Sequence, residues 1–349
     1  MKKLILVFLV LLLTGCYDYK ELEKLELVST GFVDYKNDKF HVVIEVLDTN
    51  QNTGKASYFL EGEGTYFSEA VNDIFKESTY TPYYDHMNAI VISESVAKEK
   101  LKEMYDNLAR DPGLRKDFYL LLCKDIESYK NFKIGQKESI GDKIKNTIKY
   151  SLKNNARYNA MAFRDILDSH LNYKNYVLGE IEFTEKNIKL TQTHLVQNDS
   201  LDILLDDDIA LIQNLLNNTN STFRLYNENT YEIYEYKLKK EIQNDKIVLN
   251  IDCNIRLINI VNDGAFSYKE INKLESDVNN LIKKMFKEKI DYSKQIDKDI
   301  FNFNYDYYLK YPKDLKSSTW KDLKYEIKVK SNVNEKGLII NSLGGLNEE

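Results

Sequence analysis

Alternating apolar and polar positions dominate the first third of the chain, interrupted by two stretches with helical spacing. One alternating segment turns at the Asn-Asp pair of positions 37–38, which is typical of a hairpin. Apolar residues recur at helical spacing after Ser68, which we expect to cap a helix, and again before the Pro-Gly pair at 112–113, which ends a second helix. The runs "MNAIVIS" and "KDFYLLLCK" predict buried strands. This order predicts a first α/β domain over residues 27–130.

The middle of the chain changes from a mainly helical pattern to strands. Residues 132–171 have apolar positions at helical spacing, most clearly in "SIGDKIKNTIKYSL" and "MAFRDILDSHL". Two predicted strands follow, "YVLGEIEFT" and "NIKLTQTHLVQ", joined by a turn. Asp206 or Asp207 is in position to cap the next helix, "DIALIQNLLNN". We therefore expect a middle domain of helices and strands over residues 131–218.

The last third combines strands with one long helix. Alternation predicts strands in "TFRLYNE", "TYEIYEYKLKKEIQ" and "KIVLNIDCNIRLINIV", and two more around "DIFNFNYDYYLKYP" and "LKYEIKVKSNV". The long helix has an apolar stripe made of Ile271, Leu274, Val278, Leu281 and Met285. Because the stripe is only about two heptads long, packing against the preceding sheet is favoured over a coiled-coil seam. These elements predict a C-terminal domain over residues 219–345, followed by a polar tail over 346–349.

The amino terminus carries the longest unbroken apolar run of the chain. Two lysines precede Leu4–Leu13, which as a helix would span about 15 Å, whereas a bilayer core is about 30 Å thick. Two small residues then precede Cys16, so the segment resembles a bacterial lipobox at the end of a signal peptide. In this interpretation residues 1–15 are the signal peptide, and residues 16–26 are the lipidated terminus and a polar tether.

Cys16 is accordingly the predicted site of lipid attachment. Its thiol would be diacylglycerated, and cleavage would make it the first residue of the mature chain. Two acyl chains, such as palmitate, hold a protein on a bilayer stably, whereas one chain is marginal. The alternative is an ordinary secretory peptide followed by an incidental cysteine. The sequence thus predicts an exported three-domain lipoprotein of the α+β or mixed α/β class, with mixed sheets and flanking helices.

Composition and charge restrict the partners of this chain. Its 349 residues are 43% hydrophobic and 30% charged, which is enough for several cores. The formal net charge is −6 and lysines are interspersed with acids, which excludes a general nucleic-acid surface. The other two cysteines, Cys123 and Cys253, each lie inside an apolar run and are predicted to be buried thiols. A single disulfide between them remains the alternative.

The histidines do not form a recognisable site in the sequence. They are His41, His86, His170 and His194, and none has a carboxylate or cysteine at metal-ligand spacing. For His86, which precedes a predicted strand, a capping or packing role is favoured over a catalytic one. The sequence therefore predicts no zinc site.

Three acidic or glycine-rich patterns are weak candidates for chemistry. Glu61 and Glu63 would share one face of a strand, which is compatible with a glycosidase pair, but a solvated strand end is favoured. The glycines at 62 and 64 lack the remainder of a phosphate-binding loop. The aspartates at 206–208 lack the glycine of a calcium loop, and helix capping explains them better. We therefore predict no catalytic residues, no cofactor and no metal.

Several landmarks together resemble the Ger(x)C family of spore-germination lipoproteins. The start resembles that family in Cys16, Asp18, Lys20, Glu21, Leu22, Val28, Ser29 and Gly31, although Tyr17 replaces a tryptophan and Tyr19 lies in a usually basic run. The segment "EGEGTYFSEAVNDI" and the longer "YYDHMNAIVISESVAKEKLKEMYDNLARDPGLRKDFYLLL" are also similar. In the longer one the matching positions are Asp85, His86, Val91, Ile92, Glu94, Arg110, Asp111 and Arg115. Near the C-terminus Asp299, Pro312 and Trp320 are similar to family landmarks.

The resemblance implies a role that the residues alone do not show. It implies the C subunit of a nutrient germinant receptor, a non-catalytic lipoprotein needed for nutrient-triggered spore germination. Its implied partners are the membrane-embedded A and B subunits, and the bilayer through acylated Cys16. The implied location is the spore inner membrane, on its outer, non-cytoplasmic face.

Two other functions compete with this interpretation. A solute-capturing lipoprotein of a transport system would have a cleft between two similar lobes joined by crossing strands. An exported glycan hydrolase would use Glu61 or Glu63 as its acid.

Overall fold

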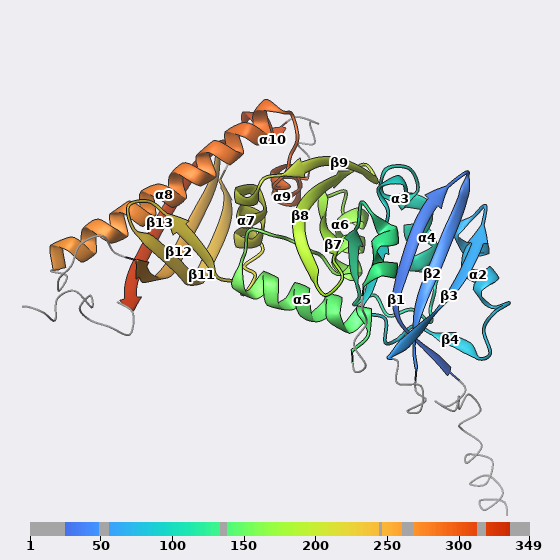
Figure 1. Cartoon of the computed structure of the whole chain (residues 1–349). Helices are drawn as coiled ribbons and strands as arrows, with labels where there is room; N and C mark the ends of the chain where they lie inside the picture. The colour runs from blue at the N-terminus through green and yellow to red at the C-terminus, as the bar shows by residue number, and fades with distance from the viewer. Residues whose placement is uncertain are drawn as a thin grey trace, which may run out of the picture.

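The structure of the protein is a computed structural model, shown in Figure 1. It describes residues 25–48, 56–132, 138–243, 246–259, 268–312 and 319–335. The predicted signal peptide, Cys16 and the tail over 346–349 lie outside these residues. The molecule is elongated, with a large sheet at one end and a small sheet, crossed by a long helix, at the other.

The large sheet combines parallel and antiparallel strands. In the part of the chain that the structure describes, it has nine strands, in the order β3-β2-β1-β5-β6-β7-β8-β9, with β4 beside the start of β1. The strands are β1 (Leu25–Lys36), β2 (Lys39–Leu47), β3 (Ser57–Gly64), β4 (Thr81–Tyr83), β5 (Ala89–Ile92), β6 (Tyr119–Leu122), β7 (Tyr176–Phe183), β8 (Ile188–Gln197) and β9 (Ser200–Leu205). Strands β1, β5, β6 and β7 are parallel, and the two outer pairs are antiparallel.

Helices cover both faces of the large sheet, as a sheet with buried parallel strands requires. One face packs on α2 (Phe67–Ile74), α3 (Glu94–Glu99), α4 (Leu101–Arg110) and α6 (Phe163–Leu171). The other packs on η2 (Ile126–Asn131) and α5 (Ile140–Asn154). The successive β5 residues Ala89–Ile92 are all buried, which explains why their sequence is uniformly apolar.

The predicted hairpin is confirmed, and the predicted cap of the first helix is wrong. Asn37 and Asp38 join β1 to β2, both with positive φ (52° and 60°), as a tight hairpin turn of this type requires. Helix α2 begins at Phe67, so Ser68 lies within the helix, and the N-cap residue Tyr66 makes no side-chain cap hydrogen bond. The Thr65 N–H donates instead to the Glu69 carboxylate, at 2.7 Å.

The second predicted helix is confirmed as two helices. Ser93 caps α3, and the chain breaks at Lys100 before α4 continues to Arg110, just ahead of the predicted Pro-Gly stop. The expected apolar residues, Leu101, Met104 and Leu108, are buried in the core of this face. The helical pattern predicted for 132–171 likewise corresponds to α5 and α6.

Strands from the predicted first and middle domains belong to the same sheet. Leu121 of β6 pairs with Gly179 of β7, and Leu122 pairs with Glu180, so the parallel part continues across residue 130. The middle segment thereby extends the first sheet with β7, β8 and the unpredicted β9. The limits 27–130, 131–218 and 219–345 remain predictions about which parts fold as units.

The small sheet belongs to the last third of the chain. It has the order β10-β11-β12-β13 in the described residues, with β13 parallel to β12 and the other neighbours antiparallel. These strands are β10 (Phe223–Tyr226), β11 (Thr230–Gln243), β12 (Lys246–Asn259) and β13 (Lys324–Glu335). The long helix α8 (Tyr268–Gln295) lies across this sheet (Figure 1) and shares its core through Leu274, Val278 and Met285. The predicted helix-on-sheet packing is confirmed.

The strand predicted around "DIFNFNYDYYLKYP" is wrong. Residues Phe303–Lys310 form helix α9, which is followed by α10 (Thr319–Asp322). The Asp299 carboxylate explains the helix start, because it accepts the N–H groups of Phe303 and Asn304 at 2.9 and 2.7 Å. The alternation of aromatic and polar residues indicated a strand, but this local cap favours a helix.

Burial of Asp299 has a consequence for stability. Desolvation raises the pKa of this carboxyl from 3.8 to about 6, with Asp306 adding to the rise, although the backbone N–H groups and Lys240 act in the opposite direction. The native protein therefore holds a proton that the unfolded chain releases. Asp299→Asn removes this titration. As pH rises from about 4 to about 6, we therefore expect the unfolding free energy of the natural chain to fall by on the order of 2 kcal/mol more than that of the variant.

Urea denaturation at several pH values measures this difference. Asp297→Asn, at an exposed neighbouring position, is the control. Its plot of unfolding free energy against pH should stay parallel to that of the natural chain. Parallel curves for Asp299→Asn as well would contradict the prediction.

The two sheets are joined through α7 (Asp207–Leu216) and a polar contact at the start of β7. Asn175 and Asn302 exchange two hydrogen bonds, each 2.8 Å long, between backbone and amide groups. The Asn175 amide also donates to the Asp299 carbonyl at 3.1 Å. This contact fixes the turn before α9 against the large sheet.

Candidate functional site

A polar pocket lies at the amino-terminal edge of the parallel strands. We call it the edge pocket. It has a volume of about 270 Å³ and lies between the start of β1, the turns that precede β5 and β6, and the first turns of α5. Its polar lining consists of Ser29, Asp85, His86, Asn88, Arg115, Asp117, Tyr119, Asp142 and Lys145. Three of these residues also carry the sequence resemblance. Asp85 and His86 lie in the turn after β4, and Arg115 lies in the turn before β6.

Asn88 connects the turn before β5 to both β1 and α5. Its backbone N–H donates to the Ser29 carbonyl at 2.8 Å. Its amide donates to Asp142 at 3.0 Å and accepts from the Lys145 ammonium at 2.7 Å. Asp85, two residues after the end of β4, accepts from the Tyr83 hydroxyl at 2.5 Å. These bonds hold the polar wall in one arrangement.

The turn before β6 supplies the charged side of the pocket. Asp117 accepts from Arg115 at 3.2 Å and from Arg164 of α6 at 2.8 Å. Both arginines are more than half exposed, so their ion pairs add little stability and leave donors facing solvent. The pocket therefore presents carboxylates and cations side by side.

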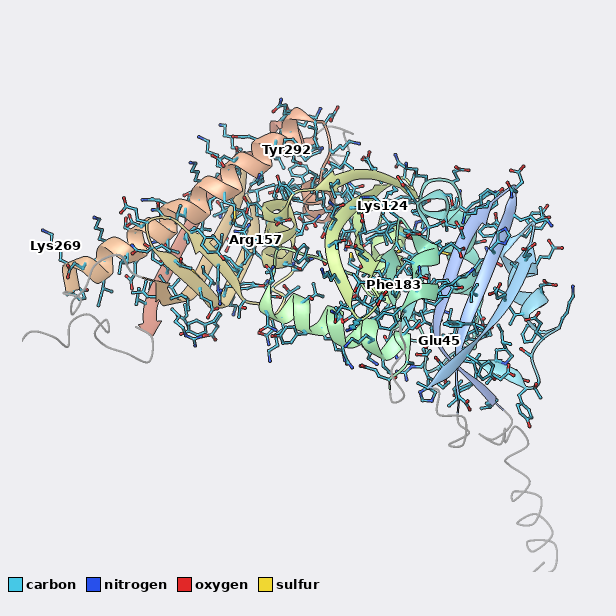
Figure 2. The ribbon with its side chains drawn as sticks, viewed as in Figure 1. Glu45, Lys124, Arg157, Phe183, Lys269 and Tyr292 are labelled. Atoms are coloured by element: carbon cyan, nitrogen blue, oxygen red, sulfur yellow. The ribbon has the colours of Figure 1, made fainter. Side chains whose placement is uncertain are left out.

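A buried carboxylate fixes the start of α5 beneath the pocket. Glu45 of β2 accepts the N–H groups of Ile140 and Gly141 at 2.7 and 3.1 Å, and the Ser57 hydroxyl at 2.6 Å. Burial raises the pKa of Glu45, although these hydrogen bonds act in the opposite direction. Figure 2 labels Glu45 at the lower end of the large sheet, beside the start of α5. Ser139 caps the same helix and contacts Ser29 at 2.7 Å.

The glutamates considered for glycan hydrolysis are exposed on β3. Glu63 contacts His41 at 3.0 Å and Lys39 at 3.9 Å, and its side chain is 56% exposed. Glu61 is also exposed, on the same face of the strand. Neither residue lines the edge pocket. This geometry lacks the enclosed pair of carboxyl groups that glycosidases use.

Packing explains the glycines between those glutamates. A Cβ added at Gly62 would lie 2.3 Å from the Ala70 carbonyl oxygen, and one at Gly64 would lie 2.5 Å from the Ala70 N. The backbone of α2 therefore rests directly on β3. The "EGEG" pattern is a helix-on-strand contact here.

The histidines occupy separate places. His41 pairs with Glu63 as described, and His170 contacts Asp199 at 2.7 Å. His194 is buried and contacts the Glu180 carboxylate at 2.6 Å, with the Lys124 ammonium 3.0 Å from the same oxygen. Among the described residues, no three His, Cys, Asp or Glu side chains are grouped closely enough to hold a metal ion.

The remaining candidates have structural roles. Asp206 caps α7 by accepting the Ile209 N–H at 2.9 Å, so of the two alternative caps, Asp206 and Asp207, the first is confirmed. Asp208 pairs with Arg157. Cys123 and Cys253 are buried and free, as the buried-thiol prediction expects. Burial raises the pKa of the two thiols to about 11 and about 12, which disfavours the reactive thiolate.

A further cavity of about 520 Å³ lies at the junction of the two sheets. Solute capture predicts similar lobes that several strands connect. Among the described strands, the two sheets differ in size, and the chain passes from one to the other once, between α7 and β10. The geometry thus differs from that expectation.

Sequence reasoning missed the α5 side of the edge pocket. Asp142 and Lys145 lie 54 and 57 positions after Asn88, their hydrogen-bond partner. No local spacing links them. The cap signal at Ser139 could have located the start of α5, but not its neighbours.

Comparison with known proteins supplies the context for this geometry. A family model described as "Spore germination protein N-terminal domain" matches residues 18–183. A second, described as "Spore germination B3/ GerAC like, C-terminal", matches residues 192–337. The chain belongs to the GerAC-like family of spore germination proteins. The resemblance inferred from the sequence landmarks is therefore confirmed.

Members of this family and one solved structure show the extent of the similarity. Spore germination protein KC of Bacillus subtilis (strain 168) is 30% identical over 122 residues, which are 30% of this chain and 29% of KC. Spore germination protein B3 of the same organism is 24% identical over 127 residues, which are 34% of each chain. Each alignment spans about a third of the relative's length.

The crystal structure of the GerBC protein has the same fold. Its TM-score is 0.51 at 16% identity, covering 87% of this chain and 96% of that one. The predicted mixed α/β class, with mixed sheets and one long C-terminal helix, is confirmed. Among the described residues, no helix combines the length and hydrophobicity that a membrane span requires.

Proposed function

We propose that this spore germination protein is the lipid-anchored, non-catalytic C subunit of a nutrient germinant receptor. It would lie on the outer face of the spore inner membrane and act by contacting the membrane-embedded A and B subunits. The observation that carries the proposal is the family match, which begins at residue 18, two positions after Cys16 of the lipobox-like sequence.

The place of the edge pocket supports contact with membrane partners. Strand β1 begins at Leu25, about nine residues after Cys16, and nine extended residues reach about 30 Å. The pocket adjoins this end of β1 through Ser29. An acyl anchor at Cys16 would therefore keep the pocket within a thin layer above the bilayer. Confinement raises the effective concentration of partner subunits, so weak polar contacts suffice.

The surroundings of the titratable groups support a role without catalysis. Three of the four described histidines pair with carboxylates, each in a separate place, and the fourth, His86, contacts the Tyr83 ring. The exposed Glu61 and Glu63 lack an enclosing site. The buried thiols have raised pKa values. A protein whose titratable side chains are paired, exposed or buried in this way is suited to binding a partner.

Cys16→Ala tests the anchor. Without the thiol that receives the diacylglyceryl group, we expect the chain to lose its stable attachment, because two acyl chains supply most of the affinity for the bilayer. In spores, the fraction of the protein that sediments with inner membranes should fall about tenfold or more. Two multi-spanning proteins should co-purify with the natural chain and not with the variant, and the nutrient response should weaken.

Cys123→Ala is the matched control, because it removes a buried thiol and leaves the proposed anchor intact. It should keep membrane attachment and partners. Mass spectrometry of the natural protein should show a diacylated first residue. An unmodified residue 16, or full membrane retention of Cys16→Ala, would refute the proposed anchor.

A further inference from the structure

An apolar cavity lies between the large sheet and helices α2 and α4. It has a volume of about 350 Å³. Its floor is made by β1, β2 and β5, and its roof by the two helices. The main lining residues are Gly31, Val42, Ile44, Val71, Ile90 and Leu108. Pockets of this size with mostly apolar walls are typical of small-molecule sites.

The glycine at the floor has no structural reason to be glycine. Gly31 lies in the middle of β1, paired with Ile44 on one side and Ile90 on the other. A Cβ there would meet only Ile90 Cγ1, at 3.6 Å, which is an ordinary contact, and its φ is outside the left-handed range. Gly62 differs, because helix backbone occupies the place of its Cβ.

A glycine inside a strand has a cost. It destabilises the strand by roughly 0.5–1 kcal/mol relative to alanine, and often marks a place where a ligand approaches the backbone. At Gly31 the missing side chain leaves the sheet floor open to the cavity. The glycine therefore preserves space at this position.

One polar group in the cavity wall is left without a partner. The Tyr84 side chain lines the cavity, and its hydroxyl oxygen is buried with no hydrogen-bond partner among the described residues. An unpaired buried hydroxyl costs free energy that a bound acceptor or donor would recover. Burial also raises the pKa of Tyr84 to about 12, so the hydroxyl keeps its proton at neutral pH.

We propose that this cavity binds a small uncharged molecule, largely aliphatic, with one oxygen that hydrogen-bonds to the Tyr84 hydroxyl. The buried part of the lining is apolar and disfavours a charged ligand, which would lose its hydration there. The polar lining residues Ser68, Asn72, Arg110 and Asp111 are exposed to solvent. An apolar cavity of about 150 Å³ holds one benzene molecule, so about 350 Å³ accommodates a substituted six-membered ring. This inference is independent of the proposed anchor and receptor partners.

Photolabelling tests the site with a cyclohexanol analogue that carries a diazirine. The full-length lipidated protein, in lipid nanodiscs, is irradiated with the probe, with and without excess cyclohexanol. We expect saturable labelling of peptides that contain the cavity-lining parts of β1, β5 and α2, and at least a fivefold reduction by the competitor. Methylcyclohexane, which has a similar shape and no hydroxyl, should compete less well.

Three variants separate the cavity from other binding. Gly31→Leu and Val71→Phe fill it from the floor and from the roof, and each should reduce labelling at least fivefold. Tyr84→Phe should remove the preference for cyclohexanol over methylcyclohexane. Circular dichroism identifies any variant that does not fold. Absence of saturable labelling in the natural chain, labelling mapped elsewhere, or full labelling of a folded cavity-filling variant would overturn the proposal.

Since the probe reports on the purified protein, failure here would leave the receptor proposal standing. Full membrane retention of Cys16→Ala, conversely, would refute the proposed anchor and would have no bearing on labelling of the cavity.

Discussion

Gly62→Ala is expected to lower the unfolding free energy of the protein by at least about 3 kcal/mol. The added Cβ would lie 2.3 Å from the Ala70 carbonyl oxygen and 2.9 Å from the Ile74 N. Both atoms belong to helix backbone, which has no rotamer to change, so α2 must move away from β3. That movement would open the core that Ala70 and Ile74 share with the sheet. Urea denaturation followed by far-ultraviolet circular dichroism measures the loss.

Gly31→Ala is the matched control for this prediction. The same change of residue, in a neighbouring part of the same sheet, meets one side-chain atom at an ordinary distance. We expect an effect within about 1 kcal/mol, with a small gain because alanine restricts the unfolded chain. Equal losses at the two positions would show that contact with α2 is not what requires a glycine at position 62.

Glu45→Ala is expected to cost about 3–5 kcal/mol, because one buried carboxylate serves three donors. Its loss would leave the N–H groups of Ile140 and Gly141 without their acceptor at a helix start that water does not reach. The Ser57 hydroxyl would lose its partner as well. Thermal or urea unfolding measures the cost, and hydrogen exchange should show the first turn of α5 opening preferentially.

Asp206→Ala provides the comparison, since Asp206 also caps a helix but is exposed. Water can replace its side chain there, so we expect a cost of about 1 kcal/mol. If both substitutions cost the same, burial of the Glu45 carboxylate would not be the source of its effect.

Local signals in the sequence predicted local features well. The turn at Asn37 and Asp38, the cap at Asp206 and the apolar stripe of α8 each depend on residues a few positions apart. The mixed α/β class follows from the same periodicities. Two local signals gave wrong predictions: Ser68 lies within α2 and does not cap it, and the aromatic alternation after Asp299 belongs to helix α9.

Features that depend on contacts distant in sequence could not be predicted. The glycine pattern of β3 gave no indication of its packing partner, which is the backbone of the following helix. In the edge pocket, the resemblance marked Asp85, His86 and Arg115, but the residues from α5 are brought there only by the fold.

Strand β1 has a mechanical consequence for any protein held by its amino terminus. The strand lies in the interior of the large sheet, with β2 paired along one side and β4 and β5 along the other. A pull on Leu25 would act along the strand, so the ladders on both sides would bear the load simultaneously. Hydrogen bonds in shear break together, whereas those of an edge strand can be peeled away singly. Tension entering at this end would therefore be shared between the ladders on the two sides of β1.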